Sequence, residues 1–253
     1  MSTQPKQGFV DSCQTQFGGG GGAQRAGAWL DPTSDTWNQR IKPVVQGSVR
    51  EASALYHESL QGGARTITGN DLPVGEPHGT FPIAASDPAY SYDRNPNAIS
   101  AQSVSYQLPA NPTAAQSPWC VGLGAIGITR DGVLLFDALD AEGRDAGARE
   151  LQDSCGGHPE MRGEYHYHAI GACLLDARPG TAELVGYAID GYGIYAEWNA
   201  AGNLPTDRDL DACHGRTSAV PWNGATATVW HYDVTLEYPY TVGCYHGTPV
   251  SGR

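Results

Sequence analysis

Residues 164–168 form a pentapeptide in which two tyrosines alternate with two histidines, and this alternation restricts how the segment can fold. A β-strand turns successive side chains to opposite faces of its sheet, so His166 and His168 would share one face and Tyr165 and Tyr167 the other. Two imidazoles held side by side on a stiff strand make half of a metal site. The pattern therefore predicts a strand with one ligand face and one aromatic core face.

A third histidine lies just before that strand. His158 belongs to residues 155–159, where two glycines and a proline favour a turn. A turn that leads into the strand can return this imidazole over the His166 and His168 pair. The alternative is that all three rings are hydrogen-bonded structural residues and that the alternation reflects strand burial alone.

The composition favours many short strands joined by long loops. Among 253 residues there are 33 glycines and 17 prolines, both above average usage, and only 15 lysines and arginines together. We therefore predict a mainly β fold: a single compact β-sandwich or barrel-like domain with long irregular loops. Residues 1–27, with glycines at 18–22, are expected to form a flexible segment before a β-rich domain over residues 28–253.

Two β-hairpins are expected in the second half of the chain. Residues 121–129 and 133–136 are apolar and flank an Arg-Asp-Gly turn, and residues 184–195 contain a second pair of apolar strands around Asp190 and Gly191. The other expected elements are strands at 65–70, 103–108 and 229–235 and a short acidic helix within 138–151.

The pentapeptide has a weak internal echo. Residues 229–233 repeat its aromatic-His-Tyr core, and each copy is followed by a cysteine, Cys173 or Cys244. The echo either adds a second ligand strand beside the first or arises by chance, because two short matches do not establish a repeat architecture.

The charge of the chain limits its partners. A net charge of −12 argues against a nucleic-acid partner, which requires a basic patch, and disfavours binding to anionic membrane surfaces. No apolar run is long enough to span a bilayer. The expected partner is a small-molecule or extracellular polymer substrate, and the oligomeric state is left open.

Six cysteines lie at positions 13, 120, 155, 173, 213 and 244, with no Cys-x-x-Cys pair among them. This spacing argues against a thiolate zinc ribbon or a thioredoxin motif. An even count in a loop-rich, lysine-poor chain suggests disulfides and an oxidising compartment. Residues 1–6 lack the apolar core of a signal peptide. Because of the cysteines, we nevertheless expect a secreted or periplasmic protein whose signal peptide is absent from this chain.

Five ordered segments resemble the YHYH-domain proteins, and they are residues 153–159, 164–168 with Cys173, 186–195, 210–216 and 238–247. The resemblance covers residues 119–249 and implies a largely extracellular group without a secure common reaction, often suspected of binding metal through its namesake motif. Two positions depart from the family pattern. Asp233 stands where the family's second histidine-rich strand typically has a histidine, and Gly193 stands where a proline is usual.

Of the fifteen possible disulfide connectivities, we expect Cys155–Cys173, Cys213–Cys244 and Cys13–Cys120. The first pair would bracket the histidine elements and contribute on the order of 3 kcal/mol through loop-closure entropy. The third pair would tie the glycine-rich N-terminal segment to the domain.

The candidate metal ligands are His158, His166 and His168, with His231 as a reserve ligand. Catalytic zinc sites commonly have three protein ligands and an open fourth position for water. The bound water then has a pKa of about 7, which makes it a nucleophile at neutral pH.

Glu164 and Asp190 are the candidate catalytic residues. Either carboxylate would serve as a base or as the acceptor that fixes an imidazole tautomer. The alternative for each is a surface carboxylate or a turn cap, and for Asp190 the adjacent glycine favours a turn.

The expected cofactor is a divalent metal ion, zinc or copper, because imidazole suits both. Calcium is less well supported, since the acidic residues within 137–145 and 207–211 do not follow EF-hand spacing. A serine hydrolase is also disfavoured, because the chain has no Gly-x-Ser-x-Gly elbow.

Two classes of function remain open from the sequence. The first is a secreted metal-dependent hydrolase in which a histidine-coordinated ion activates water. The second is a non-catalytic extracellular module that binds metal or glycan. A copper-dependent oxidoreductase is a further alternative, because tyrosines close to copper would suit oxidation.

Overall fold

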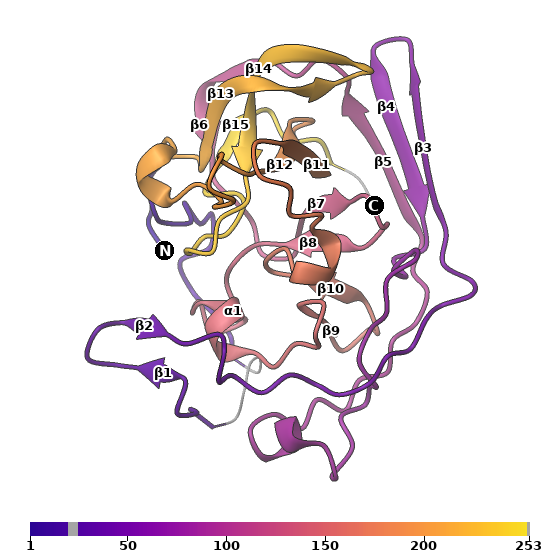
Figure 1. Cartoon of the computed structure of the whole chain (residues 1–253), viewed down its shortest axis with the longest axis vertical. Helices are drawn as coiled ribbons and strands as arrows, with labels where there is room; N and C mark the ends of the chain where they lie inside the picture. Colours follow the sequence, from indigo (N-terminus) through magenta and orange to yellow (C-terminus); the bar gives the residue numbers. More distant parts are fainter. Residues whose placement is uncertain (20–24, 252–253) are drawn as a thin grey trace.

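The computed structural model describes residues 1–19 and 25–251, and an eight-stranded mixed sheet lies at its centre (Figure 1). The order across this sheet is β13 (Gly215–Trp222), β14 (Ala225–Asp233), β12 (Gly193–Glu197), β11 (Ala182–Ala188), β7 (Ala125–Thr129), β8 (Leu134–Phe136), β10 (Tyr165–Tyr167) and β9 (Gly157–Pro159). Neighbouring strands are antiparallel, except that β10 is parallel to β8 and β14 is parallel to β12.

A three-stranded antiparallel sheet covers one face of the larger sheet. It consists of β3 (Tyr56–Gln61), β4 (Ala64–Gly69) and β5 (Val104–Pro109), at the right of Figure 1. Ile67 and Tyr106 from this sheet share a buried cluster with Ile128 and Leu134 of the larger one. Each large apolar side chain buried in this way contributes roughly 1.5–3 kcal/mol. The two packed sheets confirm the predicted mainly β class and agree with a sandwich; the eight-stranded sheet runs from β13 to β9 and is not closed into a barrel within the described residues.

The opposite face of the larger sheet carries the main core. Leu135 lies in this second cluster, whereas its neighbour Leu134 lies in the first, as strand alternation requires. Tyr165, Tyr167 and Tyr232 are fully buried in it. The remaining elements are β1 (Leu30–Asp31), β2 (Thr36–Trp37), β6 (Ala114–Trp119), β15 (Tyr245–Gly247), the short helix α1 (Ala146–Arg149) and three 3₁₀ segments at Pro88–Ser91, Ala172–Leu174 and Asp207–Asp209. None of the helices in the described ranges is long and apolar enough to cross a membrane.

Both predicted hairpins are confirmed. β7 pairs with β8 and β11 pairs with β12, each antiparallel and each joined through an Asp-Gly turn. Gly132 and Gly191 both have φ of +92°, a conformation that favours glycine because other residues carry a Cβ that clashes there. The predicted strands at 65–70, 103–108 and 229–235 correspond to β4, β5 and the end of β14, and the short helix within 138–151 is α1.

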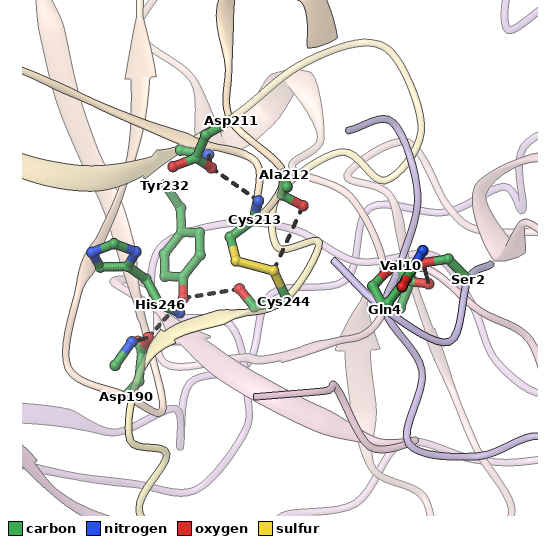
Figure 2. The surroundings of a disulfide bond; sticks show 12 residues. Ser2, Gln4, Val10, Asp190, Asp211, Ala212, Cys213, Tyr232, Cys244 and His246 are labelled. Carbon is green, nitrogen blue, oxygen red and sulfur yellow. Dashed lines mark hydrogen bonds between the residues drawn. A yellow bond between two sulfur atoms is a disulfide. The ribbon is translucent and has the colours of Figure 1, made fainter. Parts of the chain in front are cut away.

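All three predicted disulfides are confirmed: Cys13–Cys120, Cys155–Cys173 and Cys213–Cys244. The surroundings of the last are drawn in Figure 2. The first disulfide ties the N-terminal residues to the domain, where Val10 is buried and the N–H of Asp11 donates to the carbonyl of Gly243. Positions 20–22 of the predicted flexible glycine run lie outside the described residues.

Candidate metal centre

Three histidines meet at the β9–β10 edge of the eight-stranded sheet. His158 on β9 lies directly opposite His166 on β10, and His168 follows β10 by one residue on the same face as His166. All three side chains are buried, and each offers a ring nitrogen within 4.8 Å of the others. The structure therefore brings together the three residues that the sequence singled out.

The tyrosines of the same strand hold it in place from the other face. The hydroxyl of Tyr165 donates to Oδ2 of Asp153 at 2.7 Å, and the hydroxyl of Tyr167 donates to Oδ2 of Asp131 at 2.9 Å. Both rings belong to the main core. The β10 strand is thus fixed by buried hydrogen bonds and packing, so the histidine side chains project from a rigid backbone.

The ring orientations of His166 and His168 are set by main-chain carbonyls. Nδ1 of His166 lies 3.1 Å from the carbonyl oxygen of Glu164, and Nδ1 of His168 contacts the carbonyl oxygen of Asp137. Since a carbonyl only accepts, each Nδ1 carries the proton and each Nε2 of a neutral ring presents a lone pair. These two Nε2 atoms lie 3.2 Å apart, so a cation or a proton must lie between them.

Glu150 completes the cluster. Its Oε2 lies 3.2 Å from Nε2 of His158 and 3.0 Å from Nε2 of His168. Nevertheless, neither Oε2 of Glu150 nor Nε2 of His158 has a hydrogen-bond partner of acceptable geometry within the described ranges. Two ligands of a tetrahedral zinc ion, each about 2.0–2.1 Å from it, lie roughly 3.3–3.4 Å from one another. The three contacts of 3.0–3.2 Å that join Glu150 to His158 and His168, and His166 to His168, are each close to that separation.

The electrostatics of the cluster favour a positive charge at its centre. Burial tends to raise the pKa of Glu150, but His158 and His168 outweigh this and hold that pKa well below its ordinary value. Burial, together with His158 and His168, lowers the pKa of His166 well below its usual range. Burial also acts to lower the pKa of His168, yet Glu150 and Asp137 together more than offset it and the net shift is upward.

A cavity of about 440 Å³ opens beside the cluster. Phe136 forms one wall and stacks on the His166 ring, with centroids 3.9 Å apart and an interplanar angle of 20°. The charged side chains around the cavity are mainly carboxylates: Asp93, Asp137, Asp140, Glu150 and Glu160, with Arg94. A cavity of this size accommodates a small molecule or one end of a polymer, and its acidic wall attracts cations.

Glu164 reaches the cluster through its main chain. Its carbonyl accepts the Nδ1–H of His166, whereas its carboxylate pairs with Arg162 at 3.2 Å. Glu164 thus fixes the tautomer of an imidazole, one of the two roles expected from the sequence, but with a main-chain atom.

The structure does not bring Asp190 or His231 to this cluster. Four strands of the sheet, β12, β11, β7 and β8, lie between β14, which carries His231, and β10. Asp190 accepts hydrogen bonds from the Tyr232 hydroxyl at 2.7 Å and the Gly247 N–H at 2.9 Å, so it caps a turn (Figure 2). The expected positions of His231 as a reserve ligand and Asp190 beside the histidines are therefore corrected, because both belong to the other half of the sheet.

Sequence reasoning missed Glu150. It is the C-cap residue that follows α1, whose first turn is capped by the Asp145 side chain through the N–H of Ala148. In the sequence, Glu150 lies at the end of an acidic stretch and eight residues before His158. This spacing matches no metal motif. The carboxylate approaches the histidines from a loop, whereas His158 and His166 lie on strands of the sheet.

Comparison with known proteins gives one family. Residues 105–207 match the family model described as YHYH protein. This interval contains the three histidines, Glu150 and Phe136, and it ends before β13. No curated protein matches the chain, and no solved structure does.

Proposed function

Because this chain carries a YHYH domain whose namesake tetrapeptide spans residues 165–168, we propose that its histidine cluster binds a divalent metal ion and uses it in hydrolysis. His158, His166 and His168 would bind the ion through nitrogen, and Glu150 would contribute a carboxylate oxygen beside it. One observation carries the proposal: two Nε2 lone pairs face each other at 3.2 Å while both Nδ1 atoms face main-chain carbonyls.

The donor set favours zinc. Metal-bound histidines usually donate their second ring N–H to a carbonyl or carboxylate, as His166 and His168 do here. Imidazole suits zinc and copper alike, but zinc also commonly takes a carboxylate oxygen beside histidine nitrogens, and Glu150 offers one. The orphaned Glu150 and His158 atoms support the same conclusion, because both would be satisfied by an ion.

The neighbouring cavity supports a catalytic role. A bound divalent ion lowers the pKa of a water that it holds to about 7. Glu150 lies within reach of such a water and would accept its proton, since this carboxylate is kept ionised by the adjacent imidazoles. Phe136 and the surrounding walls would exclude bulk water from the histidines and leave the cavity side for a substrate.

One observation favours a second candidate, a non-catalytic metal-binding module. Oε2 of Glu150 is as close to Nε2 of His158 and of His168 as Nε2 of His166 is to Nε2 of His168, so it would serve as a fourth ligand. A closed shell of four protein ligands is typical of structural zinc. The two candidates therefore differ in whether the ion keeps an open position.

Cobalt(II) substitution separates these candidates. For a hydrolase, adding azide should change the visible spectrum of the cobalt protein, because azide occupies an open position next to the cavity. The zinc protein should also hydrolyse at least one member of a panel of model esters, amides and phosphate esters, lose this activity on chelation and regain it with zinc. A spectrum that azide leaves unchanged would contradict the hydrolase and favour the module.

We also propose that the protein works in an oxidising compartment, secreted or periplasmic. All six cysteines are paired in the three disulfides. Structural disulfides persist in such compartments and are rare in the cytosol.

A further inference from the structure

The eight-stranded sheet has the same strand pattern when followed from either edge. The β9–β10 hairpin joins β8 in parallel, and the β13–β14 hairpin joins β12 in parallel. The hairpins β7–β8 and β11–β12 then meet in the middle through the antiparallel pair β7–β11. Each half of the sheet thus consists of one hairpin, a parallel step and a second hairpin, in the same order along the chain.

The turns of the inner hairpins share the same aspartate, glycine and tyrosine contact. Asp131 and Asp190 stand at the same place, each followed by a glycine with φ of +92°. Oδ2 of Asp131 accepts the Tyr167 hydroxyl at 2.9 Å, and Oδ2 of Asp190 accepts the Tyr232 hydroxyl at 2.7 Å. The two tyrosines occupy the same position of the pentapeptide and of its echo.

The turns before the outer hairpins match as well. Oδ1 of Asp153 and Oδ1 of Asp211 each accept from the main-chain N–H groups two and four residues later, at 2.9 and 3.1 Å in both cases. Oδ2 of Asp153 accepts from the Tyr165 hydroxyl, and Oδ2 of Asp211 accepts from Nε1 of Trp230. The residue two positions after each aspartate is a cysteine, and each forms a disulfide with the cysteine that follows its histidine strand (Figure 2 draws the second).

This equivalence pairs the metal ligands with residues of a second cluster. His158 and Arg216 both lie five residues after the turn aspartate, and each lies directly opposite the strand histidine, His166 or His231. Nδ1 of His231 lies 3.1 Å from the main-chain carbonyl two residues earlier, as Nδ1 of His166 does. His168 corresponds to Asp233.

The second cluster has a metal-like donor set with a guanidinium inside it. Glu197, His231 and Asp233 place ligand atoms within 4.8 Å of one another. Arg216 lies 3.0 Å from Oε2 of Glu197 through Nη2 and 3.0 Å from Oδ2 of Asp233 through Nε. Nε2 of His231 also lies 3.1 Å from Oε2 of Glu197, and the Ser218 hydroxyl donates to the same oxygen at 2.9 Å.

We propose that the two halves of the sheet are copies of one unit and that the second copy is a second cation site, in which Arg216 replaces the divalent ion. The inference rests on the proposed metal role of the first cluster and extends it. Compared with the first copy, the second has Arg216 in place of His158 and Asp233 in place of His168. Its positive charge is therefore a side chain of the protein itself. The chain then holds one exchangeable cation site and one that is permanently filled.

The test restores the ligands of the first copy in the second. Zinc content and zinc titration are compared for the natural chain, R216H/D233H, H166A and H166A/R216H/D233H. The proposal expects the double change to add one zinc ion per chain in both backgrounds. A folded double variant that gains no zinc would overturn it. The zinc content of the natural chain tests the first cluster separately. If the natural chain binds no zinc but R216H/D233H binds one zinc ion, the proposed function is refuted and this inference is supported.

A second variant covers the case in which the double change prevents folding. Removing the guanidinium alone, in H166A/R216A, leaves Glu197, His231 and Asp233 as three ligands. Zinc should then raise the Tm of H166A/R216A but not that of H166A. The proposal would be overturned if zinc did not raise the Tm of H166A/R216A. It would also be overturned if R216H/D233H and H166A/R216A both failed to fold even when refolded with zinc, because a free cation could not then replace Arg216.

Discussion

We expect replacing His166 with alanine to lower the zinc content from about one ion per chain, as the proposed metal role requires, to almost none. Nε2 of His166 lies 3.2 Å from Nε2 of His168, and the β9–β10 register places His158 opposite it. Loss of this nitrogen leaves a poorly held ion, because losing even a supporting contact typically costs about 10–100-fold in affinity. Mass-spectrometric metal analysis after dialysis provides the measurement.

His231→Ala is the matched control. His231 is also a buried strand histidine whose Nδ1 contacts a main-chain carbonyl, so both variants lose a similar ring and a similar hydrogen bond. Both should be destabilised, by about 1–3 kcal/mol each. Only His166→Ala should lose zinc. Equal zinc content in the two variants, whether high or low, would count against the His158, His166 and His168 cluster as the specific site.

The second large effect is expected at Glu150. Glu150→Gln keeps the side-chain shape but removes the negative charge that lies 3.0–3.2 Å from two imidazoles. Zinc affinity should fall by at least about 10–100-fold, because a carboxylate supplies both a ligand or acceptor oxygen and compensating charge. Competition with a fluorescent zinc chelator measures the dissociation constant.

Glu160→Gln is the control for Glu150. Glu160 lies on the wall of the same cavity, but its carboxylate pairs with Arg162 on the rim. Its zinc affinity should remain near that of the natural chain. If Glu150→Gln bound zinc as tightly as Glu160→Gln does, Glu150 would have no direct role at the ion, and the four-residue cluster would reduce to three histidines.

Local patterns in the sequence predicted the strands and hairpins well. Alternation at 103–108 corresponds to β5, which buries one face. Alternation at 164–168 corresponds to β10, which buries its tyrosines in the core and its histidines in the cluster. The Asp-Gly turns of both hairpins require glycine at a positive φ. The disulfide pairs were also predicted correctly. Two of them, Cys155–Cys173 and Cys213–Cys244, each connect the segments before and after one histidine strand, so their partners are close in the chain.

The arrangement across the sheet was not accessible to the same reasoning. His231 was expected beside the first cluster because of a short sequence echo, and Asp190 as a candidate base. The two parallel steps place both in the other half of the sheet. Glu150 was missed for a related reason. Its approach to the histidines depends on how α1 and the following turn pack, which no periodicity records.

The echo itself carried more information than two short matches indicated. Its chemistry becomes visible only when hydrogen bonds are compared, since Tyr165 corresponds to Trp230 and His158 to Arg216. Different side chains fill equivalent positions, and sequence similarity between the halves is low at those positions. What the two halves of the sheet share is the geometry of their turn aspartates and disulfides.

The metal centre can be located by anomalous diffraction at the zinc absorption edge, on crystals of the protein purified without chelator. We expect one strong anomalous peak about 2.0–2.1 Å from Nε2 of His158, His166 and His168, with Glu150 facing it. No such peak is expected beside Arg216. A zinc-loaded crystal with no density between the three histidines, or with zinc bound through other residues, would contradict the assignment of this cluster as the metal centre.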